Sequence, residues 1–355
     1  MDHEARDRDE GYQSPPWQST WMSRDVLQRL ERDDDDVNEY LEGFNFVDAG
    51  SWIEGAGRII GKTTRLKEMD LWFTTRGSDG QNAWIYELCE GLSRNRTIEK
   101  LSLFLDMDDE DVDCIVSLTP FFVHNDNLRC LEVSRIPSPK SCDLDALLKI
   151  LSKCKSGLEF IKLELGMSDS QQVIFFNSLS EMHSNLLELW ISSKLGKMGT
   201  IALANVLMNP ACKIRLLQMN SGITYYDDDC VLHDAMIENS SIKSLHMTRS
   251  PRLPYLSSIL AHQMCSIENL WLVGCDFDDE DIICLGVALA DNRSLKHLYI
   301  ESDSVTAEAW RGFSVCFATP LALETLDIEN TEIDEEGAMV IIAALTPANI
   351  LSMER

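Results

Sequence analysis

The sequence has no pair of cysteines at the C-x-x-C spacing, although 11 cysteines are scattered through its 355 residues. Without that spacing, and with an odd number of thiols, neither a zinc site nor a disulfide framework is expected. Most of the cysteines lie among apolar residues, for example Cys114 in DCIVSL and Cys284 in DIICLG. This pattern predicts small buried thiols in a reducing compartment.

Long apolar segments are also missing. No run reaches the ~20 residues that a membrane span requires, and the charged start MDHEARDRDE lacks the apolar core of a signal peptide. We therefore expect no membrane partner and a cytoplasmic or nuclear location. Residues 1–20 are expected to form a disordered acidic tail.

Positive charge is scarce, with 31 Lys and Arg against 59 Asp and Glu and a formal net charge of −28. Such a surface repels phosphate backbones, so nucleic acid is not expected as a partner. A protein with a basic surface is the better candidate. The alternative is that the charge only keeps the chain in solution.

No catalytic motif is present: the seven histidines are dispersed, and neither H-E-x-x-H nor G-x-S-x-G occurs. The acidic clusters at 106–113 and 276–281 suggest calcium, but an EF-hand loop requires glycine at its sixth position and glutamate at its twelfth. Counting from Asp276, these positions hold Asp281 and Val287. We expect the carboxylates to cap helices, with a weak cation site as the alternative. The sequence predicts no enzyme, no cofactor and no metal.

An internal repeat is the main signal in the sequence. The apolar spacing L-x-x-L-x-L, with Ile, Val, Met or Phe also allowed, recurs along the chain. Its copies begin at Leu41, Leu66, Ile98, Leu128, Leu158, Leu186, Ile214, Ile242, Ile267, Leu295 and Leu323, with a partial twelfth copy at Ile350. Successive copies start 25 to 32 residues apart, a regularity that chance does not produce.

Each copy predicts a strand followed by a helix. The fourth and sixth positions alternate with more polar residues, which is the period of a strand with one buried face. In FDDEDIICLGVALADN, Ile282, Leu285 and Leu289 lie on one face of a helix. An asparagine often stands three residues before the next copy, and we expect it in the left-handed conformation at the helix exit. These asparagines are Asn95, Asn125, Asn239 and Asn292.

The stretch GAGRIIGKTT, residues 55–64, is close to the phosphate-binding pattern G-x-x-x-x-G-K-[ST], with Ala56 in place of the first glycine. A phosphate loop requires strand, loop and helix in that order, so that helix N-terminal amides face the phosphates. The repeat predicts the opposite order, with a helix before Gly61 and a strand after Thr63. We therefore do not expect ATP or GTP to bind here.

These units resemble the ribonuclease-inhibitor-like class of leucine-rich repeats, which alternate strand and helix. The best copy is IENLWLVGCDFDDEDIICLGVALADN, in which Cys275 fills the Asn/Cys position after the strand. The resemblance implies an α/β solenoid, or horseshoe, with a parallel concave sheet and convex helices over residues 38–355, in about 11 full repeats and a partial twelfth. Other copies lack Asn or Cys at that position, for example Lys194, and their hydrogen bonds to the turn are expected to be missing.

An eight-unit α/β barrel is the rival fold, but barrel strands are buried on both faces and read as continuous apolar runs, unlike KHLYIES and ETLDIEN. The ends of a solenoid need caps. Residues 21–37 predict an N-terminal capping helix, with Val26, Leu27 and Leu30 over the first repeat. NILSMER starts a twelfth strand without a cap. Either its edge pairs with something, a second copy of the chain included, or the chain is an incomplete gene product.

On this fold, the third, fifth and seventh places of each strand motif face the concave side. Aromatic and charged side chains at these places are typical of protein interfaces. We select as candidate binding residues Asp70, Trp72, Phe104, Glu132, Trp190, His246, Trp271, Tyr299 and Asp327. The alternative is that the aromatic rings pack on one another, or on an N-terminal segment folded into the groove.

The sequence therefore predicts a non-enzymatic scaffold that binds a protein partner through its concave face. A GTPase-activating protein or other regulator of a small GTPase is the leading alternative, because the Ran GTPase-activating protein is similar in repeat class and acidity. A third hypothesis is the recognition half of a multi-subunit ligase or immune-type receptor, whose other domains a partner would supply.

Overall fold

The structure is a computed structural model that describes part of the chain. The described residues are 24–32, 40–45, 55–74, 83–106, 116–135, 144–151, 153–154, 157–181, 185–220, 230–249, 255–302, 305–318, 321–329, 333 and 335–344. The predicted tail at 1–20 and the partial twelfth repeat at 350–355 lie outside them.

Strands and helices alternate along the described chain. The strands are β1 Tyr40–Asn45, β2 Glu68–Thr74, β3 Lys100–Asp106, β4 Cys130–Arg135, β5 Phe160–Glu164, β6 Glu188–Ile191, β7 Leu216–Asn220, β8 Ser244–Thr248, β9 Asn269–Val273, β10 His297–Glu301 and β11 Thr325–Glu329. The helices are α1 Arg24–Arg32, α2 Ala56–Lys62, α3 Ala83–Arg94, α5 Thr119–His124, α6 Leu144–Leu151, α7 Asp169–Glu181, α8 Lys197–Met208, α9 Cys230–Glu238, α10 Leu256–Ala261, α11 Asp279–Asp291, α12 Ala307–Phe313, the 3-10 helix η3 Ser314–Ala318, and α13 Glu335–Ala344.

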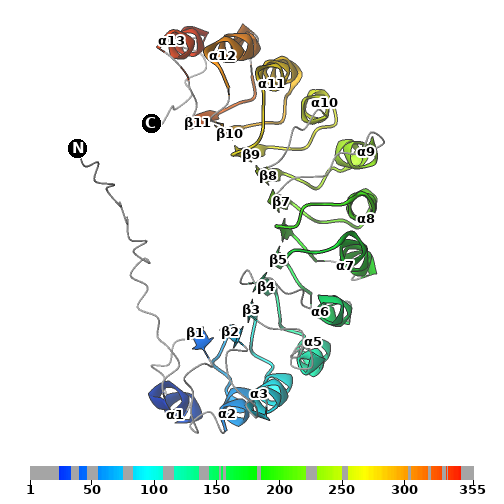
Figure 1. Cartoon of the computed structure of the whole chain (residues 1–355), viewed down its shortest axis with the longest axis vertical. Helices are drawn as coiled ribbons and strands as arrows, with labels where there is room; N and C mark the ends of the chain where they lie inside the picture. The colour runs from blue at the N-terminus through cyan, green and yellow to red at the C-terminus, as the bar shows by residue number, and fades with distance from the viewer. Residues whose placement is uncertain are drawn as a thin grey trace, which may run out of the picture.

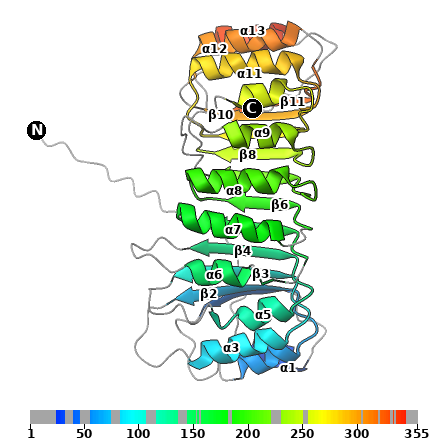
Figure 2. The same cartoon turned by 90° about the vertical axis from the view of Figure 1, so that its right-hand side faces the viewer.

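The strands form one 11-stranded sheet whose order along the sheet is the order along the chain, from β1 to β11. All neighbouring strands are parallel, for example β9 and β10, where Trp271 lies opposite Tyr299. The sheet lines the inside of an open arc, and the helices cover its outside (Figure 1). Seen from the side, strands and helices stack in regular layers (Figure 2). The predicted horseshoe is confirmed, and the closed barrel is wrong because β1 and β11 lie at opposite ends of the sheet.

The core lies between the sheet and the helices and follows the repeat motif. In the second copy, Leu66, Met69 and Leu71 are fully buried, whereas Asp70 between the last two is partly exposed. A similar alternation recurs along the sheet as far as Leu326 in β11, except that in β3 Ser102 is buried as well. Each unit buries one face of its strand against its own and the neighbouring helices, so the units form one continuous core.

The first copy of the motif is paired differently from the prediction. The spacing Leu41-Phe44-Phe46 predicts that Phe44 lies beside Met69. Instead, Leu41 pairs with Met69 and Phe44 pairs with Leu71, because the register shifts between Leu41 and Phe44. A bulge therefore interrupts β1, and apolar spacing alone gives the wrong register for this strand.

The stretch 55–64 adopts the order that the repeat predicts. Helix α2 spans Ala56–Lys62 and precedes β2, so Lys62 and Thr63 lie at the C-terminal end of the helix. The N-terminal end is occupied by a carboxylate, because the Gly55 amide donates to Glu87 Oε1 at 2.9 Å. The geometry of a phosphate loop is therefore not formed here.

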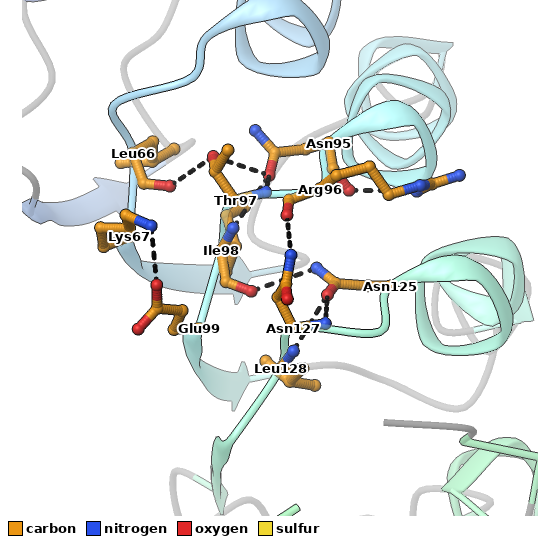
Figure 3. A network of polar contacts seen from close by, with 10 residues as sticks. All are labelled: Leu66, Lys67, Asn95, Arg96, Thr97, Ile98, Glu99, Asn125, Asn127 and Leu128. Carbon is orange, nitrogen blue, oxygen red and sulfur yellow. Dashed lines mark hydrogen bonds and ion pairs between the residues drawn. The ribbon is translucent and has the colours of Figure 1, made fainter. Parts of the chain in front are cut away.

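The buried asparagines before the strands link neighbouring repeats, and Figure 3 shows this for Asn125, whose side chain donates to the carbonyl oxygen of Ile98 in the preceding repeat. The Asn95 side chain donates to the carbonyl oxygen of Ile60 at 2.7 Å and accepts from the amides of Thr97 and Ile98 at 2.8 and 3.0 Å. The same pattern recurs at Asn125, Asn239 and Asn292.

The backbone of these asparagines corrects our expectation of a left-handed conformation. Asn125 and Asn292 are extended, with φ of −88° and −71°. Among the described residues, Arg249 alone has a positive φ without being glycine. Asparagine is needed for its two-sided hydrogen bonding in the core, since one amide can satisfy a carbonyl of one repeat and two amides of the next.

The hydrogen-bonding position after the strand also differs in one repeat. Cys275 fills it as predicted, with Sγ donating to the carbonyl of Met247 at 3.5 Å. In the repeat with Lys194, the preceding Ser193 is buried and bonds the earlier turn, accepting from the Met167 amide at 2.6 Å. The expectation of a missing hydrogen bond is therefore wrong in this repeat.

The acidic cluster at 276–281 and Cys284 lie within the described residues, so the predictions made for them can be compared with the structure. Asp278 caps α11, accepting from the Asp281 amide at 3.0 Å, while Asp281 accepts from the Asp278 amide at 3.1 Å. This capping box confirms the structural role of the cluster at 276–281. Cys284, however, is exposed on α11, so the prediction that it is buried is wrong. Cys114 and most of the cluster at 106–113 lie outside the described residues.

Helix α1 spans Arg24–Arg32 at the N-terminal end of the arc, with Leu27 and Leu30 buried. Its Glu31 pairs with Arg58 of α2 at 3.2 Å. The remainder of the predicted helix at 21–37 lies outside the described residues. Within the part of the chain that the structure describes, none of the helices has both the length and the apolar character to cross a membrane.

Candidate protein-binding surface

The concave sheet aligns the fifth places of successive strands in one row. From β2 to β11 the row contains Asp70, Ser102, Glu132, Lys162, Trp190, Gln218, His246, Trp271, Tyr299 and Asp327. Seven of the nine predicted residues lie in this row, and the other two, Trp72 and Phe104, lie side by side in the seventh-place row. Neighbouring strands in a sheet are ~4.8 Å apart, so adjacent side chains touch.

The aromatic side chains gather in three groups rather than in one patch. Near the N-terminal end, the rings of Trp72 and Phe104 stack with centroids 4.3 Å apart and an interplanar angle of 15°. In the middle, Phe160 and Trp190 meet edge to face at 5.4 Å, and Lys162 Nζ lies 5.6 Å from the Trp190 ring. In both groups the rings pack against neighbours within the sheet, although among the described residues the buried Trp190 Nε1 finds no hydrogen-bond acceptor.

The third group lies on β8, β9 and β10. The His246 ring lies 5.4 Å from the Trp271 ring, which in turn stacks on Tyr299 at 4.9 Å and 21°. Although it is packed between these neighbours, Trp271 remains 43% exposed. We call His246, Trp271 and Tyr299 the C-terminal aromatic row.

Two lysines on the N-terminal half of the concave face pair with carboxylates within the sheet. Lys100 pairs with Glu132 at 2.9 Å, and Lys162 pairs with Glu164 at 3.0 Å. Glu164 also accepts from the Ser134 hydroxyl at 2.8 Å. Both concave lysines therefore already have a carboxylate partner, which limits what this half offers to a charged ligand.

The last two strands are more acidic. The Tyr299 hydroxyl donates to Glu329 Oε2 at 2.9 Å. Burial, this hydrogen bond and the negative charges of Glu301, Glu329 and Asp327 together raise the pKa of Tyr299. The pKa of His246 is lowered from its ordinary value because burial disfavours the imidazolium, and its Nε2 lies 2.9 Å from the Ser244 hydroxyl.

A shallow hollow of roughly 280 Å³ opens beside the C-terminal aromatic row. Its lining residues are Asn269, Trp271, His297, Leu298, Tyr299, Thr325 and Asp327. Three of these, Trp271, Tyr299 and Asp327, are predicted site residues. The third-place residues Asn269, His297 and Thr325 are not among the nine, and the only signal that could have found them is their periodic position facing the concave side.

The third-place wall of the hollow is ordered by a hydrogen bond between His297 Nδ1 and Thr325 Oγ1 at 2.7 Å. Within the part of the chain that the structure describes, no group of three or more His, Cys, Asp or Glu side chains is placed to hold a metal ion. The surface therefore offers aromatic faces, carboxylates and neutral polar groups for contact.

Comparison with known proteins gives relatives but no match to a family model. Two mouse proteins, "NACHT, LRR and PYD domains-containing protein 4C" and "4E", are each 21% identical over 84% of this chain. The rat "NACHT, LRR and PYD domains-containing protein 3" is 30% identical over 37% of the chain. These names specify leucine-rich repeats, and the parallel sheet with alternating helices agrees with them.

The chain has a leucine-rich repeat fold. It spans 35% of the length of each of the two mouse relatives and 13% of the length of the rat protein. Among solved structures, a tropomodulin C-terminal domain from Caenorhabditis elegans is 19% identical over 51% of this chain and 88% of its own, with a TM-score of 0.31. Leiomodin-1 Actin-Binding Site 2 is 15% identical over 44% of this chain and 86% of its own, with the same TM-score.

Proposed function

We propose that this leucine-rich repeat chain is a non-enzymatic scaffold that binds a partner protein through its concave face. The observation that carries the proposal is Trp271, which is 43% exposed while stacked on Tyr299. A large aromatic ring left open to water on a sheet face is costly, and partner binding would remove that cost. Tryptophan and tyrosine are also the residues that most often dominate the binding energy of protein interfaces.

The exposure of Trp271 also bears on the alternative that the aromatic rings only pack on one another. Packing within the sheet accounts for Trp72 with Phe104 and for Phe160 with Trp190. It does not cover Trp271, whose stacking on Tyr299 leaves much of the indole accessible. The C-terminal aromatic row therefore supports a docking role better than the other two groups do.

The partner is expected to have a basic surface. The chain has a formal charge of −28, and the concave side of β10 and β11 includes Glu301, Asp327 and Glu329. Complementary charge speeds association and suppresses wrong partners, and its effect weakens as salt screens it. The names of the relatives support an interaction role only through the leucine-rich repeats that they specify.

The test is cross-linking mass spectrometry on full-length tagged chain with the proteins that it captures. We expect cross-links from captured proteins to the concave strands, and capture that Trp271→Ala reduces. Tyr86→Ala is the matched control, because Tyr86 lies on α3 and is 46% exposed. Cross-links confined to the helices, or an equal loss in both variants, would contradict the proposal. The GTPase-regulator hypothesis stays a prediction that a nucleotide-hydrolysis assay with small GTPases would test.

A further inference from the structure

The hollow beside the C-terminal aromatic row has two walls of different chemistry. One wall is the fifth-place row, in which Trp271 and Tyr299 stack and Asp327 follows on the next strand. The other is the third-place row, in which His297 and Thr325 are joined by a 2.7 Å hydrogen bond. A group that enters the hollow therefore meets aromatic rings, a carboxylate and neutral polar atoms at once.

The charge around the hollow has one sign. The concave positions of β9, β10 and β11 carry three carboxylates, Glu301, Asp327 and Glu329, and neither lysine nor arginine. This composition contrasts with β3 and β5, where Lys100 and Lys162 already neutralise concave carboxylates. The C-terminal end of the concave face is therefore acidic and attracts positive charge on a partner.

The size of the hollow limits what it can hold. Pockets for small molecules and cofactors have volumes of about 300–1,000 Å³ and enclose most of the ligand. The hollow has roughly 280 Å³ and is open to solvent on the concave side. It fits one long side chain of a docked protein better than a free metabolite.

We propose that this hollow receives an arginine side chain of the partner, with its guanidinium against Trp271 and Tyr299 and its positive charge beside the Asp327 carboxylate. The inference rests on the proposed function, because it names the chemistry that the concave face recognises. Arginine fits better than lysine for two physical reasons. Its planar guanidinium stacks on aromatic rings, and it is more weakly hydrated than an ammonium group.

The probes are three peptides in which glycine alternates with arginine, lysine or citrulline, titrated into full-length chain by fluorescence anisotropy. Citrulline keeps the shape of arginine and removes its charge. We expect the arginine peptide to bind most tightly and the citrulline peptide to bind at least ~10-fold more weakly, because it loses all of its positive charges and not only the contact in the hollow. Asp327→Asn should weaken arginine binding to a similar degree.

One control variant separates the hollow from net charge, and a second variant tests the aromatic ring. Glu308→Gln removes one negative charge on α12, where Glu308 is highly exposed and pairs with Arg311, and it should leave affinity within about 2-fold. Trp271→Ala, which removes the exposed ring, should weaken arginine binding ~5-fold. Thermal unfolding of each variant shows that the fold is intact.

Three results would overturn the proposal: equal binding of the arginine and citrulline peptides, preference for lysine, or the same loss in Glu308→Gln as in Asp327→Asn. The proposed function is judged separately by the cross-linking experiment. If captured proteins cross-link to the concave strands while Asp327→Asn binds the arginine peptide normally, the hollow proposal fails and the scaffold proposal stands. If cross-links avoid the concave strands and Asp327→Asn still loses arginine binding, the scaffold proposal fails and the hollow remains an arginine site.

Discussion

Gly57 of α2 and Gly91 of α3 touch backbone to backbone: a Cβ atom on Gly91 would lie 1.8 Å from the Gly57 carbonyl oxygen. A Cβ on Gly57 would likewise meet the Glu87 carbonyl oxygen at 2.1 Å. Gly57 of the stretch GAGRIIGKTT is thus explained by close contact between two helices. Because glycine has no side chain, the two helices approach more closely at this point than any other residue would allow.

This contact predicts that Gly91→Ala destabilises the chain by about 2 kcal/mol or more, because the obstacle is backbone that cannot rotate away. Gly166→Ala is the matched control, since no atom lies within 4 Å of a Cβ at that position. Urea unfolding followed by circular dichroism measures both. Equal midpoints for the two variants would show that the helices separate without cost.

The buried asparagines predict a second loss of stability. Asn125 is fully buried and holds three backbone groups, so Asn125→Ala leaves those groups unsatisfied and should cost about 3 kcal/mol. Asn127 lies two residues further along the chain and is exposed, so Asn127→Ala should lower the free energy of unfolding by less than about 1 kcal/mol. Chemical denaturation of the two variants gives the comparison. If Asn125→Ala is as stable as Asn127→Ala, the buried asparagine side chain does not stabilise the link between repeats.

Acid should weaken the fold through His246. Burial holds its folded-state pKa below the ordinary value of 6.5, so below that value the unfolded chain binds more protons at this residue. The contribution of His246 to stability is therefore full at neutral pH and is lost as the pH falls from about 6.5 toward the folded pKa. His246→Gln should reduce the loss of stability between pH 7 and pH 5, values that bracket a typical histidine pKa of about 6.5, as measured by urea midpoints. An unchanged slope would refute the assignment.

Thiol reactivity should separate two cysteines that the sequence alone treats alike. Cys316 is fully buried, and burial raises the pKa of its thiol to about 12, whereas Cys284 is exposed on α11. Because the thiolate is the reactive form, iodoacetamide at pH 8 should label Cys284 far faster than Cys316. Peptide mass spectrometry of the native chain gives the rates, and labelling after denaturation is the control. Comparable rates in the native chain would mean that the helix containing Cys284 is covered.

The sequence predicts the register of β2 to β11 because each strand alternates buried and polar residues, and a slip of one residue would turn Leu71 or Leu326 to water. The prediction is wrong at β1. The apolar spacing places Phe44 opposite Met69, but a bulge between Leu41 and Phe44 shifts the register, so that Phe44 lies opposite Leu71. Hydrogen-bonding roles are harder to predict than burial. Ser193 substitutes for its neighbour because the turn, not the motif, decides which side chain reaches the core.

The candidate site is predicted in part. The row of Trp271, Tyr299 and Asp327 follows from periodicity, since large or charged residues stand out at fixed positions. The hollow does not, because Asn269 and Thr325 are small neutral residues that no pattern marks as functional. Their role arises only when three strands from different repeats lie side by side.

The matching of strand order to chain order has a consequence for how the molecule forms. Each strand pairs with the strand that precedes it in the sequence, so folding does not require contacts between segments that are far apart in the chain. Any two adjacent units can act as a nucleus, and growth proceeds outward by adding one unit at a time. During synthesis the arc can therefore assemble progressively behind the ribosome, with each emerging unit templated on the edge already in place.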